Sequence, residues 1–107
     1  MIRYANVIAL KPEKEAEYRE LHRAVWPTVL AKIAECNIRN YSIFLNDSLL
    51  FAYFEYHGED FEADSAKVAA DPETQSWWKL TDPCQEPVGN ATPGQWWVTM
   101  EEVFHVD

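Results

Sequence analysis

The sequence has few glycines, few cysteines and few basic residues, and each shortage excludes a class of site. The three glycines, Gly58, Gly89 and Gly94, are scattered and cannot form a glycine-rich phosphate-binding loop. The two cysteines, Cys36 and Cys84, have no CxxC spacing, so we expect ordinary thiols rather than a disulfide or a catalytic nucleophile. The sequence therefore contains no recognisable nucleotide-cofactor motif and no cysteine-based redox or metal motif.

Basic residues are also scarce, with 9 Lys and Arg against 18 Asp and Glu, for a formal charge of −9. This charge repels phosphate backbones and anionic headgroups, so we expect neither nucleic acid nor a membrane surface as a partner. No stretch approaches the ~18 apolar residues of a membrane span. Arg3 and Asn6 interrupt the apolar N-terminal run where a signal peptide would be uninterrupted, so we expect a cytoplasmic protein.

The three histidines are the remaining candidates for metal ligands. His22, His57 and His105 lie in three different predicted elements and show no HxH, HxxxH or HExxH spacing. The sequence therefore predicts no metal site and no cofactor.

Aromatic residues, by contrast, are abundant. The chain has 107 residues, 48% of them hydrophobic, and includes five Trp, five Tyr and five Phe. This length predicts one domain over residues 1–107. So many rings are difficult to bury in a small core, so we expect some of them to line a pocket or an interface.

Apolar periodicity and turn residues divide the chain into predicted elements. Pro27 lies inside the longest predicted helix, so we expect that helix to kink just after Trp26. Asp71 is expected to cap the helix that starts at Pro72. The elements are a strand at 2–10, a helix at 12–36, a strand hairpin at 38–46 and 49–57, a helix at 59–70, a short helix after residue 71, a loop at 81–94 and a strand at 95–106.

This order predicts an α+β fold of the ferredoxin-like, split βαβ type, a four-stranded antiparallel sheet with helices on one face. Both faces of the predicted third strand are apolar, although the helices can cover only one of them. A second copy of the sheet is the simplest cover and gives a homodimer; the alternative is that the 81–94 loop folds over the open face. The two faces of the strand carry Leu49, Phe51 and Tyr53, and Leu50, Ala52, Phe54 and Tyr56.

A set of amphipathic rings is the candidate site. Tyr18, His22 and Trp26 recur every four residues along one helical flank. Such a stripe more often packs in a core, but flat rings with polar tips also bind the C–H faces and hydroxyls of a small sugar. His22 is then the side chain suited to proton transfer near neutral pH. Tyr41 and the adjacent Trp77 and Trp78 complete the set.

The chain resembles the L-rhamnose mutarotase family nearly end to end. The resemblance is carried by the Tyr-x-x-x-His-x-x-x-Trp-Pro run at 18–27, the segment Asn-Tyr-Ser-Ile at 40–43, the Trp pair and the ending Glu-Val-Phe-His at 102–105. It implies a dimeric α/β barrel and a cofactor-free enzyme that interconverts the anomers of L-rhamnose. It also implies that His22 is the proton donor and that Tyr18, Tyr41, Trp77 and Trp78 bind the sugar.

One segment departs from this family. Members usually have a Met-rich segment after the Trp pair and then an Asn-Pro-Asp-type loop, whereas residues 80–87 here read Leu-Thr-Asp-Pro-Cys-Gln-Glu-Pro. We expect this segment to border the pocket. The predicted substrate is therefore L-rhamnose or a related deoxy-sugar.

The predicted reaction needs one acid and one base, because the ring oxygen gains a proton while the anomeric hydroxyl loses one. His22 can supply the acid. The sequence leaves Tyr41, a water molecule and an acidic residue open as the base. Two other functions fit a ferredoxin-like domain of this size: a small cofactor-independent monooxygenase and a non-catalytic ligand-binding dimer.

Overall fold

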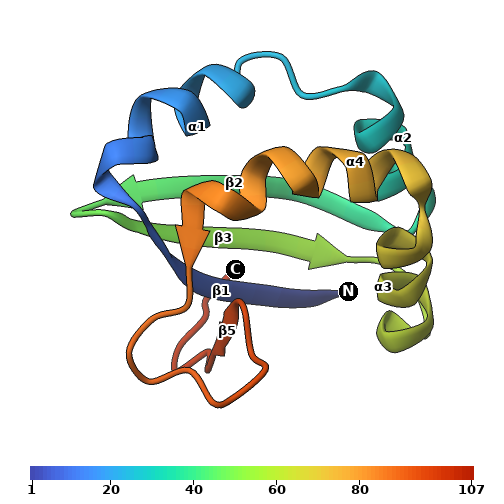
Figure 1. Cartoon of the computed structure of the whole chain (residues 1–107). Coiled ribbons are helices and arrows are strands. Elements are labelled where there is room, and N and C mark those ends of the chain that lie inside the picture. Colours follow the sequence, from blue (N-terminus) through green and yellow to red (C-terminus); the bar gives the residue numbers. More distant parts are fainter.

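An antiparallel sheet forms the base of the computed structural model, which describes residues 1–107 (Figure 1). The strands run in the order β2-β3-β1-β4, and β5 pairs with the same edge of β1 as β4. The strands are β1 (Ile2–Leu10), β2 (Ile38–Asn46), β3 (Leu49–Tyr56), β4 (Gln85–Glu86) and β5 (Val98–Met100). β4 and β5 together occupy the place of the predicted fourth strand.

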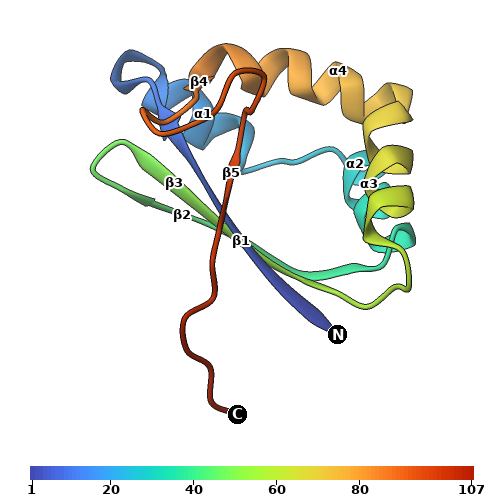
Figure 2. The same ribbon diagram turned by 90° about the horizontal axis from the view of Figure 1, so that it is seen from below.

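The helices lie on one side of this sheet, and α3 lies at one end of it (Figures 1 and 2). They are α1 (Glu15–Leu21), α2 (Pro27–Glu35), α3 (Phe61–Ala70) and α4 (Pro72–Thr81), with short 3-10 turns η1 (Pro12–Lys14) and η2 (Asp82–Cys84). No helix is long and apolar enough to cross a membrane. The ferredoxin-like α+β arrangement predicted from the sequence is confirmed.

The hairpin between β2 and β3 turns where the sequence predicts it. Asp47 and Ser48 have φ angles of 51° and 58°. Two consecutive residues in the left-handed region match the right-handed twist of the flanking strands, as in two-residue hairpin turns.

The predicted helix over residues 12–36 is wrong in one respect, because it is two helices rather than one kinked helix. α1 ends at Leu21, and α2 begins at Pro27. Trp26 has an extended ψ of 133°, the conformation that a following proline ring favours. Pro27 occupies the first turn of α2, where its missing N–H leaves no helical bond unmade.

Aspartates cap the next two helices. The Asp60 carboxylate accepts a hydrogen bond from the Ala63 backbone N–H, at 3.1 Å. Asp71 accepts from both the backbone N–H and the hydroxyl of Thr74, at 2.9 and 2.8 Å. The predicted cap at Asp71 is confirmed, and it fixes the start of the helix that carries the Trp pair.

The two faces of the sheet differ in burial. Leu50 and Phe54 of β3 point toward the helices and are buried. Phe51 points the other way, opposite Phe44 of β2 and Val7 of β1. Phe44 is 62% exposed, so this open face has an apolar surface that no part of the chain covers at that point.

The chain after β5 differs from the predicted strand at 95–106. Only Val98–Met100 pair with β1, and residues 101–107 run away from the body of the fold as an extended arm (Figure 2). Val103, Phe104 and Val106 on this arm are exposed. Beyond Met100 the backbone pairs with no strand, and the arm keeps an ion pair with β1 between Glu102 and Arg3, at 2.9 Å.

Candidate active site

A cavity lies between the helices and the helix-covered face of the sheet. It has two adjoining lobes of about 650 and 560 Å³. The α2 lobe is lined by Val25, Val29, Leu30 and Ile33, and the β4 lobe by Asn6, Thr81, Asp82 and Gln85. The five side chains predicted for the site line both lobes: Tyr18, His22, Tyr41, Trp77 and Trp78.

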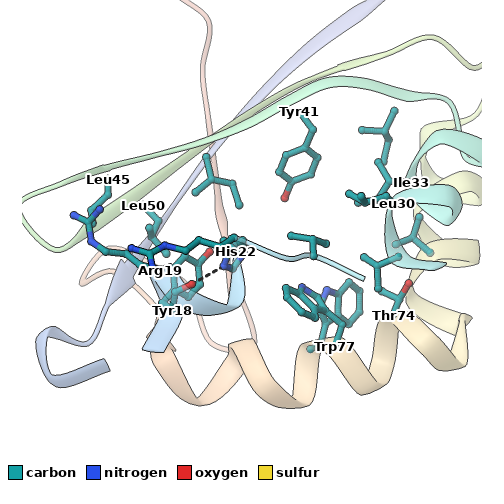
Figure 3. Close-up of a pocket in the computed structure, with 17 residues that line it drawn as sticks. Tyr18, Arg19, His22, Leu30, Ile33, Tyr41, Leu45, Leu50, Thr74 and Trp77 are labelled. Carbon is teal, nitrogen blue, oxygen red and sulfur yellow. Dashed lines mark hydrogen bonds between the residues drawn. The ribbon is translucent and has the colours of Figure 1, made fainter. Parts of the chain in front are cut away.

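Tyr18 of α1 and His22, which caps the C-terminus of α1, lie one helical turn apart and line the cavity (Figure 3). Their ring centroids are 4.1 Å apart. Nδ1 of His22 lies 2.9 Å from the backbone carbonyl oxygen of Tyr18. Because a carbonyl only accepts, Nδ1 must carry the hydrogen and donate it. Nε2 makes no hydrogen bond within the chain, which leaves this atom for a ligand.

Tyr41 reaches the cavity through an irregularity in β2. Regular alternation would put Ile38 and Tyr41, three residues apart, on opposite faces of the sheet. A β-bulge at Asn40, whose φ is 51°, absorbs one extra residue between Arg39 and Ser42. Both Ile38 and Tyr41 therefore line the cavity, and the Tyr41 hydroxyl points from the sheet toward the helices (Figure 3).

The two adjacent tryptophans of α4 differ in their surroundings. Trp77 is 5% exposed and packs edge-on against Trp26 and His22, with ring centroids 5.3 and 5.6 Å away. Trp78 is 38% exposed and also borders both lobes. Trp26, which the sequence grouped with the candidate rings, supports Trp77 and lines neither lobe.

The segment after the Trp pair borders the cavity, as the sequence predicted. Thr81, Asp82 and Gln85 line the β4 lobe, together with Trp96 and Trp97 from the following loop. These three residues of the predicted 81–94 loop, and the two tryptophans after it, face the cavity on the helix side of the sheet. Sequence reasoning did not place Trp96, Trp97 or Asn6, a residue of the first strand, at the site.

Burial raises the pKa of both tyrosines that line the cavity, Tyr18 and Tyr41. It raises the pKa of Tyr18 well above the ordinary tyrosine value, more than the hydrogen bond from Gln85 Nε2 to the Tyr18 hydroxyl, at 3.2 Å, lowers it. Burial also raises the pKa of Tyr41. Although 43% of this residue is accessible, its accessible surface faces the cavity. Both phenols therefore keep their protons at neutral pH.

Asp82 is the one carboxylate that lines either lobe. Burial raises the pKa of Asp82 above the ordinary aspartate value, and a hydrogen-bonding interaction with the Trp96 side chain acts in the opposite direction. No Lys, Arg or His nitrogen lies within ion-pair distance of this carboxylate.

The two cysteines of the chain line neither lobe of the cavity. Cys36 and Cys84 are both buried and unpaired. Burial, together with a hydrogen bond to the Glu17 carboxylate, raises the pKa of Cys84 to about 11, so it stays a thiol at neutral pH. No three His, Cys, Asp or Glu side chains come together as a metal-binding group.

Known proteins resemble this chain over its whole length. The family model described as L-rhamnose mutarotase matches residues 3–106. The L-rhamnose mutarotases of Opitutus terrae and Oceanobacillus iheyensis are 37% and 32% identical to this chain over 109 aligned positions, and each alignment covers 100% of both chains.

Two solved structures share the fold. The L-rhamnose mutarotase of Formosa agariphila superposes with a TM-score of 0.79 at 22% identity, and the tetracenomycin F2 cyclase of Streptomyces glaucescens with 0.71 at 13%, each over 100% of both chains. Because a polyketide cyclase has the same fold, the fold alone does not identify the reaction.

Proposed function

This chain belongs to the L-rhamnose mutarotase family, and on that premise we propose that it is an isomerase that interconverts the α and β anomers of L-rhamnose or a related deoxy-sugar. The observation that carries the proposal is the free Nε2 of His22 in a cavity lined by aromatic rings. These are the two parts such an enzyme needs, a proton-transfer group and a surface that binds a sugar ring.

In this mechanism His22 acts as the proton donor. In its imidazolium form, with Nδ1 bonded to the Tyr18 carbonyl, His22 gives its Nε2 proton to the ring oxygen while the anomeric hydroxyl loses one, so the ring opens to an aldehyde. Rotation about the bond between C1 and C2 exposes the other face of the carbonyl. Closure reverses the proton transfers and gives the other anomer. The hydrogen bond from Nδ1 to the Tyr18 carbonyl keeps the imidazole in one orientation through both transfers.

The sugar is bound by Tyr18, Tyr41, Trp77 and Trp78, the rings that line both lobes. Their faces pack against C–H groups, and the two phenols, which hold their protons, donate hydrogen bonds to sugar oxygens. The α2 lobe, with side chains such as Val29 and Ile33, accepts the methyl group of a 6-deoxy sugar.

The enzyme works as a homodimer in which two open sheet faces pack together. Support comes from the cross-strand row of Phe44, Phe51 and Val7, which is apolar and, at Phe44, exposed. It works in the cytoplasm, where a reducing environment suits its two unpaired cysteines, Cys36 and Cys84.

Saturation-transfer NMR tests the activity directly. Magnetisation is saturated at the α-anomeric proton of L-rhamnose, and its transfer to the β anomer is measured with and without the protein. We expect faster exchange with the protein, and a panel of deoxy-sugars and parent hexoses ranks the substrates. Sugar binding without faster exchange would indicate a binding module, and oxygen consumption with an aromatic substrate would indicate a monooxygenase.

A further inference from the structure

We propose that Asp82 is the second proton-transfer group of this site and accepts the proton of the anomeric hydroxyl while His22 protonates the ring oxygen. This inference rests on the proposed mutarotase function, which requires a base as well as an acid. Of all the side chains that line the two lobes of the cavity, Asp82 is the one carboxylate.

The fold holds Asp82 on a segment that is packed against the helix of His22. Asp82 begins η2 directly after α4, four residues beyond Trp78. Two hydrogen bonds tie the following residues to α1: the Cys84 thiol donates to the Glu17 carboxylate at 3.3 Å, and Gln85 Nε2 donates to the Tyr18 hydroxyl at 3.2 Å. The carboxylate and the imidazole therefore belong to two segments whose relative position is fixed.

The surroundings of Asp82 suit a base. Without an ion-pair partner, the carboxylate has its charge available for a ligand proton. Partial burial raises the pKa of Asp82, which makes the carboxylate a stronger proton acceptor than an exposed aspartate. The Trp96 side chain interacts with it and limits that rise in pKa. An unpaired carboxylate with a shifted pKa at a cavity wall has the properties that a catalytic base requires.

Tyr41, which the sequence left open as the base, fits this role less well, and so do the other titratable side chains near it in the cavity. Burial raises the pKa of Tyr41 and of Tyr18, so each phenol is a proton donor at neutral pH. The Tyr18 oxygen already accepts a hydrogen bond from Gln85. Arg19 and Arg23 line the α2 lobe, but a guanidinium keeps its charge and accepts no proton.

The proton balance closes without a co-reactant. In the opening step the O1–H proton moves to the Asp82 carboxylate and C1=O1 forms. The C1–O5 bond breaks, its electron pair stays on O5, and O5 takes the proton from His22 Nε2. After rotation about C1–C2, O5 returns its proton to His22 and attacks C1, while O1 takes the proton back from Asp82. Both residues end in their starting protonation states.

The test compares Asp82→Asn with the wild-type chain by saturation-transfer NMR over a range of pH. Asparagine keeps the size and hydrogen bonding of the side chain but accepts no proton. We expect exchange to fall by about 100-fold while sugar affinity changes little. Asp82→Glu keeps the carboxylate and should restore part of the rate. Asp47→Asn is the matched control, because Asp47 lies in the β2-β3 turn and asparagine also tolerates its φ of 51°.

The pH profile separates a catalytic Asp82 from a structural one. The titratable groups that share its cavity are Tyr18 and His22 from α1 and Tyr41 from β2, with Arg19 and Arg23 in the α2 lobe. Wild-type exchange should fall at low pH as Asp82 takes up a proton, and Asp82→Asn should lose this acid limb.

A second variant tests the same idea if Asp82→Asn does not fold. Trp96→Phe removes the interaction that lowers the pKa of Asp82, so the acid limb should move to higher pH. A wild-type rate and profile in folded Asp82→Asn, or an unmoved acid limb in folded Trp96→Phe, would overturn the assignment. If the wild-type chain itself does not accelerate exchange, the proposed function fails instead, which is a distinct result.

Discussion

The imidazole of His22 is held by the residue one helical turn before it. Its ring lies 4.1 Å from the ring of Tyr18, and its Nδ1 donates a hydrogen bond to the carbonyl oxygen of the same residue, at 2.9 Å. One neighbour thus controls both the tilt of the ring and which nitrogen faces the cavity. Because Nε2 is left free for a ligand, a change at His22 should alter catalysis rather than stability.

Replacing His22 with glutamine should separate binding from turnover. Glutamine can hydrogen-bond a sugar oxygen but cannot protonate it, so we expect anomer exchange to slow by about 100-fold or more with little loss of sugar affinity. His57→Gln is the control, since His57 is exposed and lines neither lobe. A folded His22→Gln protein with normal exchange at pH 7 would remove His22 from the mechanism.

Both tryptophans of the pair line the site, but Trp77 should contribute mainly to packing and Trp78 mainly to sugar binding. Trp77→Phe removes part of a buried ring cluster, so we expect it to lower the free energy of unfolding by roughly 1–3 kcal/mol. Trp78→Phe should leave the melting temperature nearly unchanged and weaken sugar binding by about 3- to 10-fold. Thermal melts and sugar titrations of both variants check this, and equal effects on stability and affinity would contradict it.

Local sequence signals predicted most of the fold correctly. Asp71 before Pro72 located the start of α4, and Asp47-Ser48 located the hairpin, because both depend on neighbouring residues alone. The apolar stripe through residues 12–36 misled the helix prediction. Periodicity continues across residues 22–26, but α1 ends at Leu21, and Trp26, directly before Pro27, has an extended backbone.

The sequence could predict the neighbours within one stretch of helix, but not the side chains whose position depends on the pairing or packing of two elements. Tyr18 and His22 are neighbours because His22 caps α1 four residues after Tyr18. The direction of Tyr41 depends on a bulge that is visible only in the pairing with β3. Asp82 lies beyond the end of α4, so no periodic pattern connects it to the cavity.

The bulge at Asn40 should be sensitive to the type of residue there. Its φ of 51° is costly for a β-branched side chain, and its amide donates to the Glu55 carboxylate at 2.6 Å. We expect Asn40→Val to lower the free energy of unfolding by about 1–3 kcal/mol and to weaken sugar binding, because Tyr41 follows the bulge. Asn40→Gly adopts the same backbone freely and should bind sugar almost normally. Equal affinities for the two variants would show that the bulge does not position Tyr41.

Stability should fall at acid pH partly through Asp64. This carboxylate accepts hydrogen bonds from the Tyr56 hydroxyl and from Asn37 Nδ2, and they lower its pKa in the folded protein. A lowered folded pKa stabilises the protein above the unfolded pKa, near ~4, and that contribution disappears as pH falls through the folded pKa. Urea unfolding should therefore show a large difference between wild type and Asp64→Asn at pH 7 and a smaller one near pH 3. A difference that is independent of pH would contradict this role.

The open face of the sheet leads to the last prediction, which concerns assembly. Phe54 is buried on the helix side, so the half-buried Phe51 and its exposed cross-strand neighbour Phe44 form the apolar surface of the open face. A charge there would be buried without a partner when two faces meet. Phe44→Asp should therefore sediment as a monomer at micromolar concentration, where the wild-type chain sediments as a dimer. Leu80→Asp is the control, because Leu80 is exposed on α4 and should leave the dimer intact. If the wild-type chain is a stable monomer at that concentration, the apolar face needs another explanation than a second copy of this chain.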